Sequence, residues 1–279
     1  MSRIASFALT LLISTIVGFA ATTALSAPIA SGDLIAVTNT QFCCSPTVAP
    51  NVYQLDSSGA FKSFSFSPFF PSDIAVDKAG RVLYGSSGSG NIVLTDTSGA
   101  FLGFLSTPVS QVNGLGVAND GSLFVASGNS IYHLDAQGHF LGLTFSPVSF
   151  NSSTPLGVLG NDTVVFVDPA TTVCCGPSNV GLDLFDTSTR VLSHVTTPLT
   201  SITGLDVSET GQFWVAGSTS GFFGSPSNTI FELNSAGAQL KSIVGPENMS
   251  ALAIANLPEP SVGLLLGLGL SILAVGRRR

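Results

Sequence analysis

The sequence predicts an all-β fold, namely a five-bladed β-propeller in which each blade has four antiparallel strands. Four types of short strand recur in a fixed order, and the first type returns after 41, 41, 49 and 47 residues. The body of the chain shows no long amphipathic helical pattern. A repeating unit of about 40 residues with four antiparallel strands is typical of a propeller blade.

Two apolar strand types open each unit. The first type lies at 74–77, 115–118, 156–159, 205–208 and 252–255. The second type lies at 34–37, 82–84, 123–125, 164–166 and 213–215. Gly, Asp, Asn and Ser are frequent between them, and the Asp120-Gly121 pair suits a hairpin turn that needs a positive φ angle.

The third strand type ends in an acidic or amide residue, and the fourth follows after a short turn. The third strands cover 52–56, 92–96, 131–135, 182–186 and 230–234, and the fourth begin at Phe61, Phe101, Phe140, Val191 and Leu240. The closing residues are Asp56, Asp96, Asp135, Asp186 and Asn234. Their recurrence in every unit indicates turns stabilised by these side chains rather than calcium ligation.

The order of the strand types predicts how the ring closes. The body begins with a second-type strand at Leu34 and ends with a lone first-type strand at Leu252. The last strand should therefore complete the first blade, which hides two sheet edges. Each strand type occurs five times, so the spacing predicts five blades.

The repeat resembles that of NHL-type and related six-bladed propellers. The shared features are the Gly-Leu-x-Val segment (114–117), the Asp-Gly turn and the Tyr-x-Leu-Asp segment (132–135). The resemblance covers the whole body, and it implies a sixth blade where the spacing implies five. It also implies an alternative function, because relatives include lactonases and lyases. Such lactonases hold a metal in the channel with Glu, Asn and Asp, whereas the inner strands here offer Asp77 and Asp206. We therefore expect no catalytic residue, no cofactor and no metal.

The C-terminus combines a short polar motif, an apolar run and a basic end. The motif is Pro258-Glu259-Pro260, the uncharged run covers 261–276, and Arg277, Arg278 and Arg279 follow. A helix over 261–276 would be about 24 Å long, which is short for a membrane span. The three arginines would stay on the cytoplasmic side and leave the body outside the inner membrane.

This tail resembles the PEP-CTERM sorting signal of Gram-negative bacteria. The resemblance implies that a membrane transpeptidase of the exosortase type recognises the Pro-Glu-Pro motif and cleaves there. Leu257 stands where the family often has Val, which is a small departure. We therefore assign 257–279 to a sorting tail with a transmembrane helix and 28–256 to the propeller domain.

The N-terminus has the pattern of a secretory signal peptide. Arg3 gives a positive start, Phe7 to Ala21 is apolar, and small residues precede Pro28. We expect residues 1–27 to be removed by signal peptidase after passage through the export machinery. The alternative is a permanent membrane anchor.

The charge of the body excludes nucleic-acid binding. Only 9% of all residues are charged. Between the two terminal segments there are five basic residues, Lys62, Lys78, Arg81, Arg190 and Lys241, against fifteen acids. The resulting net charge of about −10 lacks the clustered cations that phosphate groups require.

Two pairs of adjacent cysteines lie in long insertions between second and third strands. Cys43-Cys44 belongs to the first blade and Cys174-Cys175 to the fourth, while the fifth blade has two phenylalanines at the equivalent place. These blades are neighbours in a five-membered ring, so the loops should gather on one side of one face. The candidate binding face consists of Phe42, Cys43, Cys44, Cys174, Cys175, Phe222 and Phe223. Alternatively, the cysteines staple the loops and the aromatic side chains cap the propeller.

The pairing of the cysteines stays open. A bridge within a pair must join Cα atoms about 3.8 Å apart, which is below the usual disulfide range. A bridge between loops avoids that strain but must pass the loop of the fifth blade. Free thiols or a metal site are the third possibility. A zinc site is not expected, because His133, His139 and His194 fall in outer strands or turns.

Taken together, the resemblances imply an exported, exosortase-sorted envelope or extracellular-matrix protein with a non-catalytic binding or structural propeller. It would be anchored briefly in the inner membrane and then reach the cell surface or the extracellular space. Its implied partners are the exosortase and exopolysaccharide or another surface protein.

Overall fold

The computed structural model describes residues 28–38, 50–67, 70–96, 98–146, 148–150, 154–168, 179–219 and 228–257. These residues form five antiparallel sheets of four strands each. The predicted signal peptide and the tail from Pro258 onward lie outside the described residues, so their helices stay predictions. Within the described ranges, no helix has the length and hydrophobicity needed to cross a membrane.

The strands follow the predicted units closely. The first blade contains β20 (Met249–Ile254), β1 (Leu34–Thr38), β2 (Asn51–Leu55) and β3 (Phe61–Phe66), in that order. The second contains β4 (Asp73–Val76), β5 (Val82–Gly85), β6 (Asn91–Thr95) and β7 (Phe101–Ser106). The third contains β8 (Gly114–Val117), β9 (Leu123–Ser127), β10 (Ser130–Leu134) and β11 (Phe140–Phe145). The fourth contains β12 (Leu156–Leu159), β13 (Thr163–Val167), β14 (Gly181–Asp186) and β15 (Val191–Thr196). The fifth contains β16 (Ser201–Val207), β17 (Phe213–Ser218), β18 (Thr229–Leu233) and β19 (Gln239–Val244).

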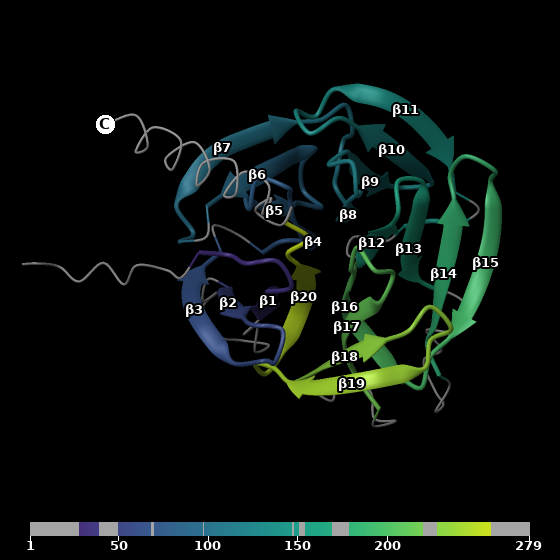
Figure 1. The fold of residues 1–279 in the computed structure, drawn as a ribbon. Coiled ribbons are helices and arrows are strands. Elements are labelled where there is room, and N and C mark those ends of the chain that lie inside the picture. The colour runs from purple at the N-terminus through teal and green to yellow at the C-terminus, as the bar shows by residue number, and fades with distance from the viewer. Residues whose placement is uncertain are drawn as a thin grey trace, which may run out of the picture.

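The blades are arranged radially around a centre (Figure 1). The strands nearest that centre are β4, β8, β12, β16 and β20, and each contacts the next one around the ring. The prediction of five four-stranded blades is therefore confirmed, and the six-bladed count implied by the resemblance is wrong for this chain.

The first blade is built from both ends of the body. β20 pairs with β1 in antiparallel fashion, with Leu34 opposite Ile254 and Ala36 opposite Leu252. Just beyond this pairing, the Gly32 N–H donates to the Ala255 carbonyl at 2.8 Å. The predicted closure of the ring by the last strand is confirmed.

Apolar side chains fill the space between neighbouring blades. All residues of β1 and β4 are buried, whereas β15 is almost entirely exposed. Between the third and fourth blades, Phe124 packs in one cluster with Phe166 and Phe185. Burial thus decreases from the inner to the outer strand, as expected when each sheet is covered on both faces only near the centre.

The residues that close the third strands stabilise the turns that follow. The Asp96 Oδ1 atom accepts hydrogen bonds from the Ser98 N–H at 2.8 Å and the Ala100 N–H at 2.9 Å. Asp56, Asp135, Asp186 and Asn234 make equivalent bonds in the other blades. The hydrogen bond from the Ser188 hydroxyl, together with those from the Thr189 and Ser188 amides, lowers the pKa of Asp186 to about 2. The predicted role of these residues in turns is confirmed.

The alternation of strand direction gives the ring two distinct faces. On the turn face lie the short turns between first and second strands and between third and fourth strands. On the loop face lie the connections between second and third strands and between blades. Because β1 starts and β20 ends at the turn face, both ends of the body leave the ring there. The strand ends that flank the long insertions lie on the opposite face.

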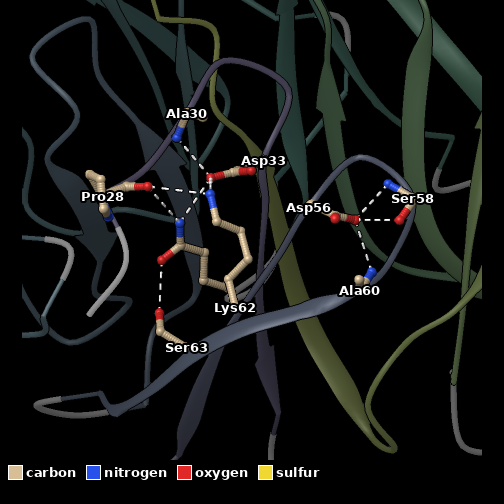
Figure 2. A network of polar contacts seen from close by, with 9 residues as sticks. Pro28, Ala30, Asp33, Asp56, Ser58, Ala60, Lys62 and Ser63 are labelled. Carbon is tan, nitrogen blue, oxygen red and sulfur yellow. Dashed lines mark hydrogen bonds and ion pairs between the residues drawn. The ribbon is translucent and has the colours of Figure 1, made fainter. Parts of the chain in front are cut away.

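A polar network fixes the start of the body to the turn face (Figure 2). The Asp33 Oδ2 atom accepts bonds from the Ala30 N–H at 2.7 Å, from Gln54 Nε2 at 2.8 Å and from Lys62 Nζ at 2.5 Å. Gln54 and Lys62 also donate to the Pro28 carbonyl. Because Gln54 lies in β2 and Lys62 in β3, the segment before β1 is held by its own blade.

The close approach of the inner strands predicts which glycines cannot be replaced. A Cβ atom at Gly157 would lie 2.7 Å from Val207 Cγ2 and 3.0 Å from the Val207 nitrogen in the next blade. Gly157→Ala should therefore lower the free energy of unfolding by about 1–3 kcal/mol, measured by urea denaturation.

Gly142→Ala is the matched control, because a Cβ there would meet nothing within 4 Å. It should change stability by less than about 0.5 kcal/mol. Equal effects of the two substitutions would contradict the close packing of the inner strands.

Candidate functional site

The stems of the three long loops lie in adjacent blades on the loop face. The loop of the first blade leaves after β1 and returns at β2, that of the fourth leaves after β13 and returns at β14, and that of the fifth leaves after β17 and returns at β18. Contacts between β12 and β16 and between β16 and β20 make these blades consecutive. The loop stems are therefore neighbours around the ring, and the gathering of the loops themselves stays a prediction, because they lie outside the described residues.

The predicted binding residues themselves, from Phe42 to Cys44, at Cys174 and Cys175, and at Phe222 and Phe223, lie outside the described residues. Their joint surface and the cysteine pairing stay predictions. The same holds for the sorting motif and the three terminal arginines.

A buried carboxylate at the centre of the ring joins three blades. Asp73 is fully buried at the start of β4. Its Oδ2 atom accepts bonds from the Leu115 N–H of β8 at 2.9 Å and the Leu156 N–H of β12 at 3.0 Å. These amides lie on inner strands that have no further strand to pair with, so the side chain satisfies donors that would otherwise face the centre.

A second carboxylate joins the fifth blade to the first. Asp206 of β16 is 6% exposed, and its Oδ2 atom accepts a bond from the Ile254 N–H of β20 at 2.9 Å. Its Oδ1 atom accepts a bond from the Val207 N–H at 2.8 Å. Asp206 is thus hydrogen-bonded to β20, the strand that closes the ring.

Burial controls the protonation of both groups. It raises the pKa of Asp206 to about 7, although hydrogen bonds from Ile254 and Val207 oppose the shift. Burial also raises the pKa of Asp73 well above its ordinary value, and the charge of Asp206 adds to that effect. Both carboxyl groups are buried and hydrogen-bonded to backbone amides, so their role at the centre is to hold neighbouring blades together.

Of the two aspartates that the sequence analysis placed on the inner strands, only Asp206 lies at the centre of the ring. Asp77 was expected beside Asp206 on the inner strands, but it follows β4 on the turn face. Its Oδ1 atom accepts bonds from the Ala79 and Arg81 amides, and its Oδ2 atom pairs with Arg81 Nε at 2.6 Å. Asp73 was missed, although it stands before a buried strand where the third and fifth units have Gly114 and Gly204.

The fourth blade holds a second polar cluster, near the loop face. Asp168 follows β13, Asp183 lies within β14 and His194 lies within β15. The His194 Nδ1 atom is 3.1 Å from Asp183 Oδ1 and 3.5 Å from Asp168 Oδ2. Burial raises the pKa of Asp183, and the nearby Asp168 charge adds to this effect, whereas the His194 hydrogen bond opposes it. The sequence analysis missed this cluster because its members are 26 residues apart at the extremes.

The other two histidines lie in the third blade, apart from this cluster. His133 stacks on Phe124 with ring centroids 4.5 Å apart, and its Nε2 atom lies 2.9 Å from the Ser122 hydroxyl. The His139 Nδ1 atom pairs with Asp135 Oδ2 at 2.8 Å in an exposed turn. The sequence placed the three histidines in outer strands or turns, and the structure has His133 in the third strand β10, His139 in a turn and His194 in the outer strand β15. His194 nevertheless lies beside two carboxylates.

The rim of the second and third blades carries exposed apolar side chains. They lie on the outermost strands β7 and β11, which follow one another around the ring (Figure 1). The residues are Phe101, Leu102, Phe104, Phe140, Leu141, Leu143 and Phe145. Exposed apolar patches of this kind often mark interaction surfaces.

No protein-family model matches the chain, and no curated protein is similar to it. Among solved structures, the chain is similar to a protein of unknown function from Bacteroides caccae, with 11% sequence identity and a TM-score of 0.48. The similarity covers 80% of this chain and 98% of the other. No functional conclusion follows from it.

The raised pKa of Asp206 predicts a pH-dependent stability. Since the carboxyl titrates at 3.8 when unfolded and at about 7 when folded, its contribution is complete below pH 4 and is lost as pH rises to 7. Relative to Asp206→Asn, the free energy of unfolding of the unmodified protein should fall by at most about 4 kcal/mol over this range. Urea denaturation at a series of pH values measures this difference.

Asp186→Asn is the control for the pH series. Its pKa is lowered to about 2 in an exposed turn, so its contribution is lost only as pH falls below 4. The difference between this variant and the unmodified protein should stay constant from pH 4 to 8. A flat difference for Asp206→Asn as well would show that its carboxyl is not shifted by burial.

Proposed function

We propose that this protein is an exported envelope or matrix protein, sorted by an exosortase-type transpeptidase, whose propeller binds an extracellular partner without catalysing a reaction. The observation that carries the proposal is the C-terminal order of Pro258-Glu259-Pro260, an uncharged run and three arginines. This order directly follows a body whose last described residue is Leu257. The apolar N-terminal segment before Pro28 supports the export part of the proposal.

The topology of the ring supports sorting by removable ends. Neither end is needed for a strand, because β1 begins at Leu34 and β20 ends at Ile254. The network around Asp33 holds the start of the body from within the first blade. Cleavage near residues 27 and 258 would therefore leave every described sheet complete.

The placement of the ends also supports a binding role for the loop face. Since both ends leave from the turn face, a tail anchored in the membrane would hold that face toward the lipid. The strands of the ring are four to seven residues long, or about 13–23 Å. The strand ends that carry the long loops would thus lie about that distance from the turn face, on the side that faces extracellular polymers.

The central carboxylates support a non-catalytic propeller. Ligand sites of propellers are often built around the central channel, but Asp73 and Asp206 accept bonds from backbone amides of neighbouring blades. Their function in the ring is accounted for by these bonds. The exposed apolar rim on β7 and β11 is a further surface for a partner.

Fractionation of a Gram-negative host that encodes an exosortase tests both parts of the proposal. Changing Pro258, Glu259 and Pro260 to Ala should leave a longer chain in the inner membrane, whereas the unmodified chain becomes shorter and reaches the surface. Deleting 42–46 and 173–177 should leave processing unchanged but release most of the protein from the cell surface, because the loop face is lost.

Pro246→Ala with Glu247→Ala is the matched control, since it alters the other Pro-Glu pair of the chain, between β19 and β20. It should be processed normally. Normal processing of the Pro258–Pro260 variant would contradict sorting by the tail. Unchanged surface retention of the loop deletion, with an intact β circular-dichroism spectrum, would contradict binding through the loop face.

A further inference from the structure

The five blades act as an internal alignment, and the fourth departs from the others at one cross-strand pair. Position 183 corresponds to Tyr53, Val93, Tyr132 and Phe231 in the other blades. The residue opposite it on the outer strand is His194, where the others have Phe64, Phe104, Leu143 and Ser242. Four blades thus have an apolar or aromatic residue where the fourth has a buried aspartate facing a histidine.

Two further positions change in the same blade. Asp168 corresponds to Thr38, Ser86, Ser127 and Gly217, none of which is charged. Gly181 corresponds to Asn51, Asn91, Ser130 and Thr229, all of which have side chains. A Cβ atom at position 181 would lie 2.1 Å from His194 Cε1. The missing side chain therefore makes room for the imidazole ring beside the two carboxylates.

The distances between the three side chains suit a shared cation. One ligand atom from each of Asp168, Asp183 and His194 lies within 4.8 Å of the other two. In a tetrahedral zinc site with bonds of about 2.1 Å, neighbouring ligand atoms are about 3.4 Å apart. The observed separations of 3.1 and 3.5 Å from His194 Nδ1 lie on either side of that value.

The burial and charge of the cluster also call for a cation. The Asp183 side chain is 7% exposed and that of Asp168 is 13% exposed, whereas His194 is 43% exposed and open to solvent. Two largely buried carboxylates beside an imidazole carry charge that one divalent ion would balance.

We propose that Asp168, Asp183 and His194 bind one divalent transition-metal cation of the zinc class. Imidazole and carboxylate donors suit zinc, and three protein ligands leave a fourth position for solvent or for a ligand atom of a partner. The ion would tie β13, β14 and β15 together at the loop face. Because the segment 169–178 starts directly after Asp168, the ion would fix the base of the loop that carries Cys174 and Cys175.

Equilibrium dialysis of the full-length chain against Zn²⁺ tests the site. All four cysteines are first changed to Ser, so that thiolates cannot bind the metal. This protein should retain one equivalent of zinc. His194→Gln should weaken binding at least tenfold, and Asp183→Asn should do the same. Gly181→Ala should also weaken it, although it removes no ligand atom, because the added methyl group displaces the imidazole.

His139→Gln is the matched control, because His139 also pairs with one aspartate but has no second carboxylate in that pair. It should bind zinc like its parent. Since His194 is partly exposed, His194→Gln should keep the β circular-dichroism spectrum and is the decisive variant. Absence of bound zinc in the cysteine-free parent at micromolar concentration, or unchanged binding in His194→Gln, would overturn the site and leave the histidine as a hydrogen-bonded partner of the two aspartates. Neither result depends on whether the protein is exported.

Discussion

The pairing of β20 with β1 is the contact on which the ring depends. Every other blade is a continuous segment of chain, whereas the first blade needs residues 249–254 beside residues 34–38. Without this pairing, β1 and β20 would each expose an unpaired backbone edge, and the apolar surfaces that face them in the second and fifth blades would be uncovered. Closure across more than 200 residues is costly in chain entropy, so it must be supported by well-packed neighbours.

The centre of the ring shows how such support is provided. Inner strands of a five-bladed propeller lie close together, which Gly157 illustrates by its approach to Val207. The backbone amides at the inner edges of these strands still need hydrogen-bond acceptors. Asp73 and Asp206 supply them for three different blades. Burial raises the pKa values of these two carboxyl groups, so the side chains that join the blades also make the stability of the ring sensitive to pH.

Repetition explains why most of the fold could be predicted from the sequence. Each blade repeats the same strand order, so a weak pattern at any one unit is reinforced by the other four. The offset between Leu34 and Leu252 revealed the closure, and the aspartate or asparagine that closes each third strand revealed the turns. The turns are local in sequence and follow from hydrogen bonding within a few residues, whereas the closure follows from the order of the strand types along the whole body.

The sites that were missed have the opposite character. Asp73 drew no attention in the sequence, because its partners Leu115 and Leu156 lie in other blades. Asp168, Asp183 and His194 are single departures from the repeat, and they are recognisable only after the register between strands aligns the blades. We therefore expect functional residues at positions where one blade departs from the repeat, whereas the repeated residues specify the fold of the ring.

Two truncated chains test the closure most directly. A chain that ends after Leu257 keeps β20, and a chain that ends after Asn248 lacks it. Thermal unfolding followed by circular dichroism should show a single cooperative transition for the longer chain, at nearly the same temperature as for the full-length protein. The shorter chain should show no cooperative transition. Equal transition temperatures for the two chains would contradict a ring closed by β20.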